Sequence, residues 1–191
     1  MIAFLIVSIL LIVAPGPDFA LTVRNTVVGG SRAGISTAAG VVTGLSVWGI
    51  AAAVGLATLL LASRPAFVAL RVVGGVYLVY LGMLALRAAW RGLEPAASRR
   101  RGRSPYVQGL LSDLGNPKIA VFFTGLLPQF GASFATLVWH AAIFGVLTFV
   151  WLVGVARVGG ALRRPVVRRA LDAVSGVVLV ALGSAIAVAR R

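Results

Sequence analysis

Ionisable residues inside apolar stretches are the feature of this sequence that bears most directly on chemistry. Asp18, Asp113 and Lys118 each interrupt a long hydrophobic run, and prolines lie close to them in two short motifs, Pro15-Gly16-Pro17-Asp18 and Asn116-Pro117-Lys118. Proline removes a backbone donor and interrupts a helix, and neighbouring glycine or asparagine favours an opened backbone. Carboxylate and ammonium groups beside free backbone atoms can bind the charged ends of a small zwitterion or carry a proton.

Other kinds of chemistry have little support in the composition. The chain has no cysteine and only one histidine, His140, so that it lacks thiolate ligands, disulfides and cysteine nucleophiles. Its four acidic residues are mostly far apart in the sequence and do not form the acidic cluster or nucleophile–base pair that an intramembrane enzyme needs. We therefore expect no metal, no cofactor and no enzymatic activity.

The elements that position these residues must lie in a membrane. Of the 191 residues, 60% are hydrophobic and only 12% are charged, and the mean hydropathy is +1.02. Soluble chains contain about twice that charged fraction. The net charge of +14 could indicate a nucleic-acid partner, but in so apolar a chain basic residues set topology and contact anionic headgroups. We expect no nucleic-acid partner and lipid contacts at the arginine clusters.

A membrane crossing needs about 20 apolar residues, and six intervals of the chain meet this requirement. An N-terminal signal peptide is the alternative for the first interval, but no basic residue precedes it and prolines occupy the place of a cleavage site. The six predicted crossings are approximately 2–23, the uncharged run between Arg32 and Arg64, 65–86, 106–127, 132–156 and 170–189, with a basic stretch at 87–105 and a short turn at 128–131.

The arginines predict the orientation of these crossings. With the N-terminus outside, thirteen arginines fall in cytoplasmic segments and only Arg64, Arg71, Arg190 and Arg191 fall outside. Cytoplasmic loops carry the excess of basic residues. Both termini are therefore predicted to face away from the cytoplasm.

The sequence also contains an internal repeat. Residues 69–82 align without gaps on 170–183 with nine of fourteen positions identical, and Gly44 and Pro17 fall on Gly145 and Pro117 at nearly the same offset. A duplicated unit of three crossings enters the membrane from opposite sides in its two copies, and inverted repeats of this kind are typical of transporters. We predict an all-α membrane protein of two inverted three-helix repeats, 1–91 and 106–191, joined by a basic cytoplasmic linker at 92–105.

The proline motifs occupy corresponding depths of the first and fourth crossings, which are predicted to be broken helices. Opened backbone is tolerated there only if it is buried in protein or lines a watery cavity, and half-helices that begin after each break direct positive dipole ends at an anionic group. Asp18 and Lys118 could pair across the repeat axis. Asp18 could instead stabilise only its own helix. Asp113 could either carry a proton or satisfy the unwound backbone. Asn116 could likewise have either a functional or a structural role.

Four motifs in order resemble the lysine exporter superfamily, particularly its homoserine/threonine resistance branch. They are Pro15-Gly16-Pro17, the loop Gly29-Gly30-Ser31-Arg32-Ala33-Gly34-Ile35, Asn116-Pro117-Lys118 with Phe122-Phe123, and Leu127-Pro128-Gln129-Phe130. The resemblance covers essentially the whole chain. It implies an amino acid exporter of the bacterial inner membrane, driven by protons or membrane potential, with substrate-site roles for Pro15, Gly16, Pro17, Asn116, Pro117 and Lys118.

The charges near the breaks favour a neutral substrate. Asp18 and Asp113, offset by Lys118, leave one net negative charge, whereas lysine or arginine would bring two cations and one carboxylate. We expect a threonine-, homoserine- or leucine-like substrate, bound by Asp18 with the six motif residues, and a proton carried by Asp18 or Asp113. A basic amino acid exporter is the alternative, a passive channel or scaffold is less favoured, and a homo-oligomer is possible.

Overall fold

Every element that the structure describes is helical, which confirms the predicted all-α class. The computed structural model describes residues 1–62, 64–91, 104–131, 133–158 and 165–188, so that most of the predicted linker lies outside the described residues. In chain order the elements are α1 (Ile2–Val13), α2 (Pro17–Ala62), α3 (Arg64–Arg91), α4 (Pro105–Leu114), α5 (Pro117–Val121), the π-helix η1 (Phe122–Leu126), the 3₁₀-helix η2 (Leu127–Phe130), α6 (Phe134–Val158) and α7 (Pro165–Val188).

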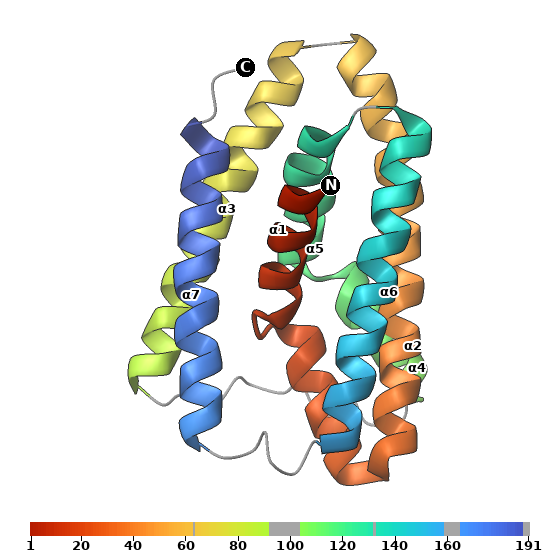
Figure 1. The fold of residues 1–191 in the computed structure, drawn as a ribbon, viewed down its shortest axis with the longest axis vertical. Helices are drawn as coiled ribbons and strands as arrows, with labels where there is room; N and C mark the ends of the chain where they lie inside the picture. The colour runs from red at the N-terminus through yellow and green to blue at the C-terminus, as the bar shows by residue number, and fades with distance from the viewer. Residues whose placement is uncertain (63, 92–103, 132, 159–164, 189–191) are drawn as a thin grey trace.

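The first break separates α1 from α2. Ala14 has φ −58° and ψ 113°, which is the extended conformation that a following proline imposes on the residue before it. Pro17 then begins the next helix, where its missing N–H and fixed φ are acceptable. Figure 1 shows α1 and the start of α2 following one another through the middle of the bundle, as the red and dark orange segment.

The long helix α2 consists of two helices joined at a turn. Gly30 has φ 76° and ψ 177°, a backbone conformation that only glycine adopts without strain. The chain reverses direction there at the lower end of the bundle in Figure 1. The first helical segment thus continues through Arg24 to Gly29, several residues beyond the predicted end at about residue 23, because the polar residues of this stretch form another helical turn and do not unwind.

The second break separates α4 from α5. The Ser104 side chain accepts a hydrogen bond from the Val107 N–H at the start of α4, and the Asn116 side chain accepts one from the Lys118 N–H at the start of α5. Both caps satisfy N–H groups that have no partner inside their own helix. After α5 the chain continues as the wider π-helix η1 and then as the narrower 3₁₀-helix η2. The predicted turn at 128–131 is therefore a 3₁₀ turn followed by Gly131.

The helices pack as two groups around α1 and α5. Helices α3 and α7 lie side by side on one flank, and α2, α4 and α6 form the other (Figure 1). Glycines bring α3 and α7 very close together: a Cβ atom on Gly82 would lie 2.8 Å from the Gly176 carbonyl oxygen, and one on Gly176 would lie 2.8 Å from the Gly82 carbonyl oxygen. A Cβ atom on Gly183 would likewise lie 2.5 Å from the Gly75 carbonyl oxygen.

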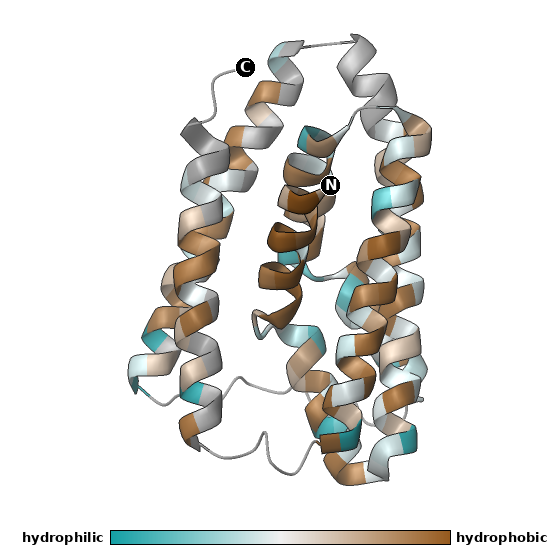
Figure 2. Ribbon diagram, viewed as in Figure 1, coloured by the Kyte–Doolittle hydropathy of each residue, from teal (hydrophilic) through white to brown (hydrophobic). Residues whose placement is uncertain are grey.

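Apolar side chains cover much of the outside of the bundle, while several polar ones lie inside. Ile50 and Val54 of α2 and Val146 and Val150 of α6 are all more than half exposed, and Figure 2 shows hydrophobic residues along α1 and along the outer helices. Within the described residues, two segments have the length and apolar composition of a membrane crossing, Pro17–Gly55 and Phe134–Val158. The buried polar or charged residues are Ser8, Asp18, Thr22, Asn25, Thr37, Asp113, Asn116, Lys118, His140 and Thr148.

Candidate functional site

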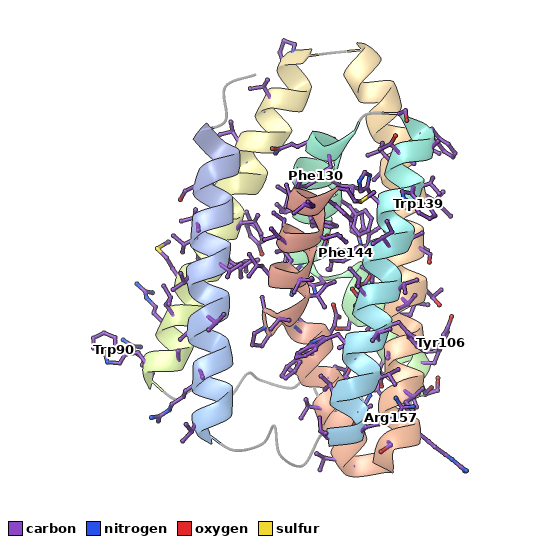
Figure 3. The ribbon with its side chains drawn as sticks, viewed as in Figure 1. Trp90, Tyr106, Phe130, Trp139, Phe144 and Arg157 are labelled. Carbon is purple, nitrogen blue, oxygen red and sulfur yellow. The ribbon has the colours of Figure 1, made fainter. Side chains whose placement is uncertain are left out.

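A small cavity lies where the two helix breaks meet. It is lined by residues of α1, α2, α4, α5 and α6 and by Ala14 and Gly16 of the first break. Phe144 of α6 extends toward this middle region of the bundle (Figure 3). The cavity volume is about 20 Å³, which is enough for about one water molecule and far too small for an amino acid. Its ionisable lining residues are Asp18, Asp113 and Lys118.

Lys118 joins the second break to the end of α1. Its Nζ atom donates hydrogen bonds to the carbonyl oxygens of Leu11, at 3.1 Å, and Ala14, at 3.0 Å. The last carbonyls of a helix have no partner within it and carry its negative dipole end, so an ammonium group is well suited to this position. A Cβ atom on Gly16 would lie 3.2 Å from this Nζ atom. Glycine therefore leaves one side of the ammonium group uncovered.

Asp18 makes the reciprocal connection, from the start of α2 to the second break. One carboxylate oxygen accepts a hydrogen bond of 2.6 Å from the Ser112 hydroxyl, and the other accepts one of 2.6 Å from the Asn116 amide. Because the Asn116 side-chain oxygen also accepts from the Lys118 N–H at 3.0 Å, Asn116 holds the start of α5 and the start of α2 together. Each helix break is thus tied to the other half of the chain.

The direct Asp18–Lys118 ion pair suggested by the sequence does not form. No nitrogen–oxygen contact of salt-bridge length joins these two described residues, because each side chain is already engaged by polar groups at the opposite break. The two charges nevertheless line the same cavity. What the sequence could not reveal is that backbone carbonyls and neutral side chains, exposed by the breaks, are the nearer partners.

Asp113 differs from both of these residues. Its side chain is 0% exposed, and neither carboxylate oxygen has a hydrogen-bond partner. It faces Gly44 of α2, where a Cβ atom would lie 2.5 Å from one carboxylate oxygen. A side chain at position 44 would therefore displace the carboxyl group, so that this glycine supplies the space that Asp113 occupies.

The residues predicted for the site divide into two kinds. Gly16, Asp18, Asp113 and Lys118 line the cavity, whereas Asn116 lies behind it, 1% exposed, as a link between the breaks. The prolines of the two motifs shape the breaks: Pro15 and Pro117 are partly buried and Pro17 is exposed. The structure therefore brings every predicted residue to one region, although only four of them face the cavity.

Sequence reasoning missed three residues near the cavity. Ser112 binds Asp18, but it belongs to α4 and Asn116 lies beyond the break, so helical spacing gave no signal that both contact the same carboxylate. Thr148 and Trp151 line the cavity from α6, but nothing in an unbroken apolar helix distinguishes them. His140 is a hydrogen-bonded buried residue: its Nδ1 atom lies 2.8 Å from the Thr136 carbonyl oxygen, and its ring packs against Phe4.

Comparison with known proteins identifies a family whose sequence pattern this chain matches. Residues 9–190 match the family described as LysE type translocator. A homoserine/homoserine lactone efflux protein of Salmonella typhimurium is 32% identical over 99% of this chain and 96% of its own length. A threonine efflux protein of the same organism is 28% identical over 85% of this chain and 82% of its own length.

An uncharacterised membrane protein of Bacillus subtilis, YrhP, is 28% identical over 79% of each chain. No solved structure matches this chain. The similar chains are thus described as membrane or efflux proteins, and the full-length matches include the region of both helix breaks.

Proposed function

Because the chain belongs to the LysE type translocator family of amino acid exporters, we propose that it exports a neutral amino acid or a close derivative, of the threonine, homoserine or leucine type. Export proceeds from the cytoplasm across the bacterial inner membrane and is coupled to protons or to the membrane potential. The similar efflux proteins for homoserine, homoserine lactone and threonine support this class of substrate.

In this proposal the chain crosses the membrane six times as two inverted repeats, 1–91 and 106–191. The order of the helices supports this number if α1 with the first segment of α2, and α4 with α5, each count as one broken helix and α2 after Gly30 counts as a separate crossing. The glycine contacts also support the repeat. Gly75 and Gly82 align with Gly176 and Gly183, and Gly82 contacts Gly176 while Gly183 contacts Gly75. Such crosswise contacts are what a pseudo-twofold axis between α3 and α7 produces.

The observation that carries the proposal is the meeting of two helix breaks at one buried cavity that contains both acidic and basic groups. Lys118 can bind the carboxylate of a zwitterion, and Asp113 or Asp18 can bind its ammonium group. Ionisable residues are expensive in a membrane interior and mark transport pathways. A basic substrate would bring two cations and one carboxylate to a site that already holds the ammonium group of Lys118, whereas a neutral amino acid brings one cation and one carboxylate.

The small volume of the cavity favours a carrier over an open channel. An amino acid can enter only if helices around the breaks separate, and a carrier exposes its site to one side at a time. Exchange of substrate across the membrane is therefore the property to measure, because a carrier accelerates exchange of labelled for unlabelled substrate whereas a channel lets both equilibrate.

The experiment is counterflow in proteoliposomes. Vesicles preloaded with unlabelled threonine or homoserine should accumulate the labelled amino acid transiently, and Lys118→Met should abolish this accumulation. Thr124→Val is the matched control, because the Thr124 hydroxyl donates to the Ala120 carbonyl oxygen four residues earlier in the chain and Thr124 does not line the cavity. Accumulation of labelled lysine without threonine or homoserine would show a basic amino acid exporter, and equilibration without overshoot would show a channel.

A further inference from the structure

The described residues around the cavity offer one free acceptor and two free donors, one of which is the buried indole N–H of Trp151. The acceptor is Asp113, whose two carboxylate oxygens are unpartnered and buried. The other donor is Lys118: an ammonium group has three N–H bonds, two of which are directed at the carbonyl oxygens of Leu11 and Ala14 at the end of α1. Asp18 is different, because both of its oxygens already accept short hydrogen bonds.

This distribution separates the roles of the two acids. The Ser112 and Asn116 donors stabilise Asp18 as a carboxylate and hold it in place, which makes it a positioning residue that connects the breaks. Lys118, donating to two carbonyls, is the cation that balances it. Asp113 has no such donors, and burying an unpaired carboxylate is costly. The cavity is therefore electrically neutral when Asp113 holds a proton and carries one negative charge when it does not.

We propose that Asp113 is the single acceptor for which the substrate ammonium group and the transported proton compete. This inference rests on the proposed function and assigns its coupling step. On the cytoplasmic side the substrate ammonium group binds the Asp113 carboxylate, the displaced proton goes to water, and the substrate carboxylate binds the free N–H of Lys118. On the outer side a proton from water returns to Asp113 and releases the amino acid. One proton enters for each amino acid that leaves.

The groups facing Asp113 are few. Asp18 on α2 and Lys118 on α5 are the titratable groups that line the cavity with it, and α1 and α6 contribute uncharged lining residues. Gly44 is the nearest part of α2 and offers no side chain. The proton that exchanges with substrate can therefore be assigned to Asp113 by changing the acids one at a time.

The test is proton release on substrate binding, measured with a pH indicator in weakly buffered detergent solution. Threonine binding to the wild-type protein should release about one proton per bound molecule and should weaken about tenfold per pH unit in the acidic range. Asp113→Asn should release none. Asp18→Asn should lose thermal stability and bind threonine more weakly, because Asp113 alone then balances Lys118. At a pH low enough to protonate Asp113, this variant should still release about one proton for each threonine that it binds. Thr124→Val should behave as wild type.

Infrared spectroscopy provides a second measurement that does not depend on substrate binding by the variant. Without substrate, the band of a neutral carboxyl group should be present in the wild type and in Thr124→Val and absent from Asp113→Asn, and threonine should remove it from the wild type. Threonine exchange without proton release in the wild type, or proton release by Asp113→Asn, would overturn the inference and leave the proposed function standing. If the wild type neither binds nor exchanges any neutral amino acid, the proposed function fails as well.

Discussion

Replacing Gly176 by alanine tests the close contact between α3 and α7. The added Cβ atom would lie 2.8 Å from the Gly82 carbonyl oxygen and 2.5 Å from the Leu86 Cγ atom, separations that real Cβ atoms do not tolerate. The Leu86 side chain can rotate, but the carbonyl belongs to the backbone of α3, so the two helices must move apart. Overpacking of this kind costs about 1–3 kcal/mol.

The matched control is Gly154→Ala on α6. Gly154 is exposed and an added Cβ atom there would contact nothing within 4 Å, so the substitution gains only the helix propensity of alanine over glycine, about 1 kcal/mol. Gly176→Ala gains the same propensity and loses more to overpacking. We therefore expect the apparent melting temperature in detergent to fall for Gly176→Ala and to rise for Gly154→Ala. Equal increases in the two variants would refute the close approach of α3 and α7.

Three further predictions concern the breaks and the topology. Asn116→Ala removes a charge-assisted hydrogen bond to Asp18 and a helix cap, together about 2–4 kcal/mol, so its melting temperature should fall further than that of Ser112→Ala; a larger effect of Ser112→Ala would contradict the bridging role. Pro17→Leu and Pro117→Leu, which let each broken helix continue, should leave insertion intact and abolish counterflow, and transport by both variants would show that the breaks are only kinks. A reporter fused after residue 191 should be active only outside the cytoplasm, and a fluorescent cytoplasmic fusion would disprove the proposed orientation.

The location of the candidate site was predictable from the sequence because charged residues and prolines are energetically costly inside a membrane and are easily seen within apolar runs. Charged residues and prolines in apolar runs are rarely tolerated without a function, and this rule, combined with the proline motifs at matching positions of the repeat, selects Asp18, Asp113 and Lys118 and places them at one depth. The partners of each residue were not predictable. They depend on which carbonyls the break after Val13 leaves free and on the direction in which they point, and these are properties of the folded backbone.

In the fold, too, the sequence pattern predicts some features, whereas others are determined only by the geometry of the folded backbone. Hydropathy indicates where apolar helices lie, but it does not show that Arg24 belongs to a continuing helix or that the reversal is confined to Gly30. Repeated glycines indicated close packing. Which glycines meet depends on the antiparallel direction and axial register of α3 and α7, and these follow from the whole bundle.

The π-helix η1 has a consequence for the history of the chain. In the proposed repeat, the offset between equivalent residues is 117 − 17 = 100 before η1 and 145 − 44 = 101 after it. The second copy thus has one residue more between Pro117 and Gly145 than the first copy has between Pro17 and Gly44, and a π-turn is the helical element that accommodates an additional residue in its hydrogen-bonded ring. An insertion absorbed in this way displaces only its own turn. The later helices then keep their register, and the glycines of α7 still meet those of α3.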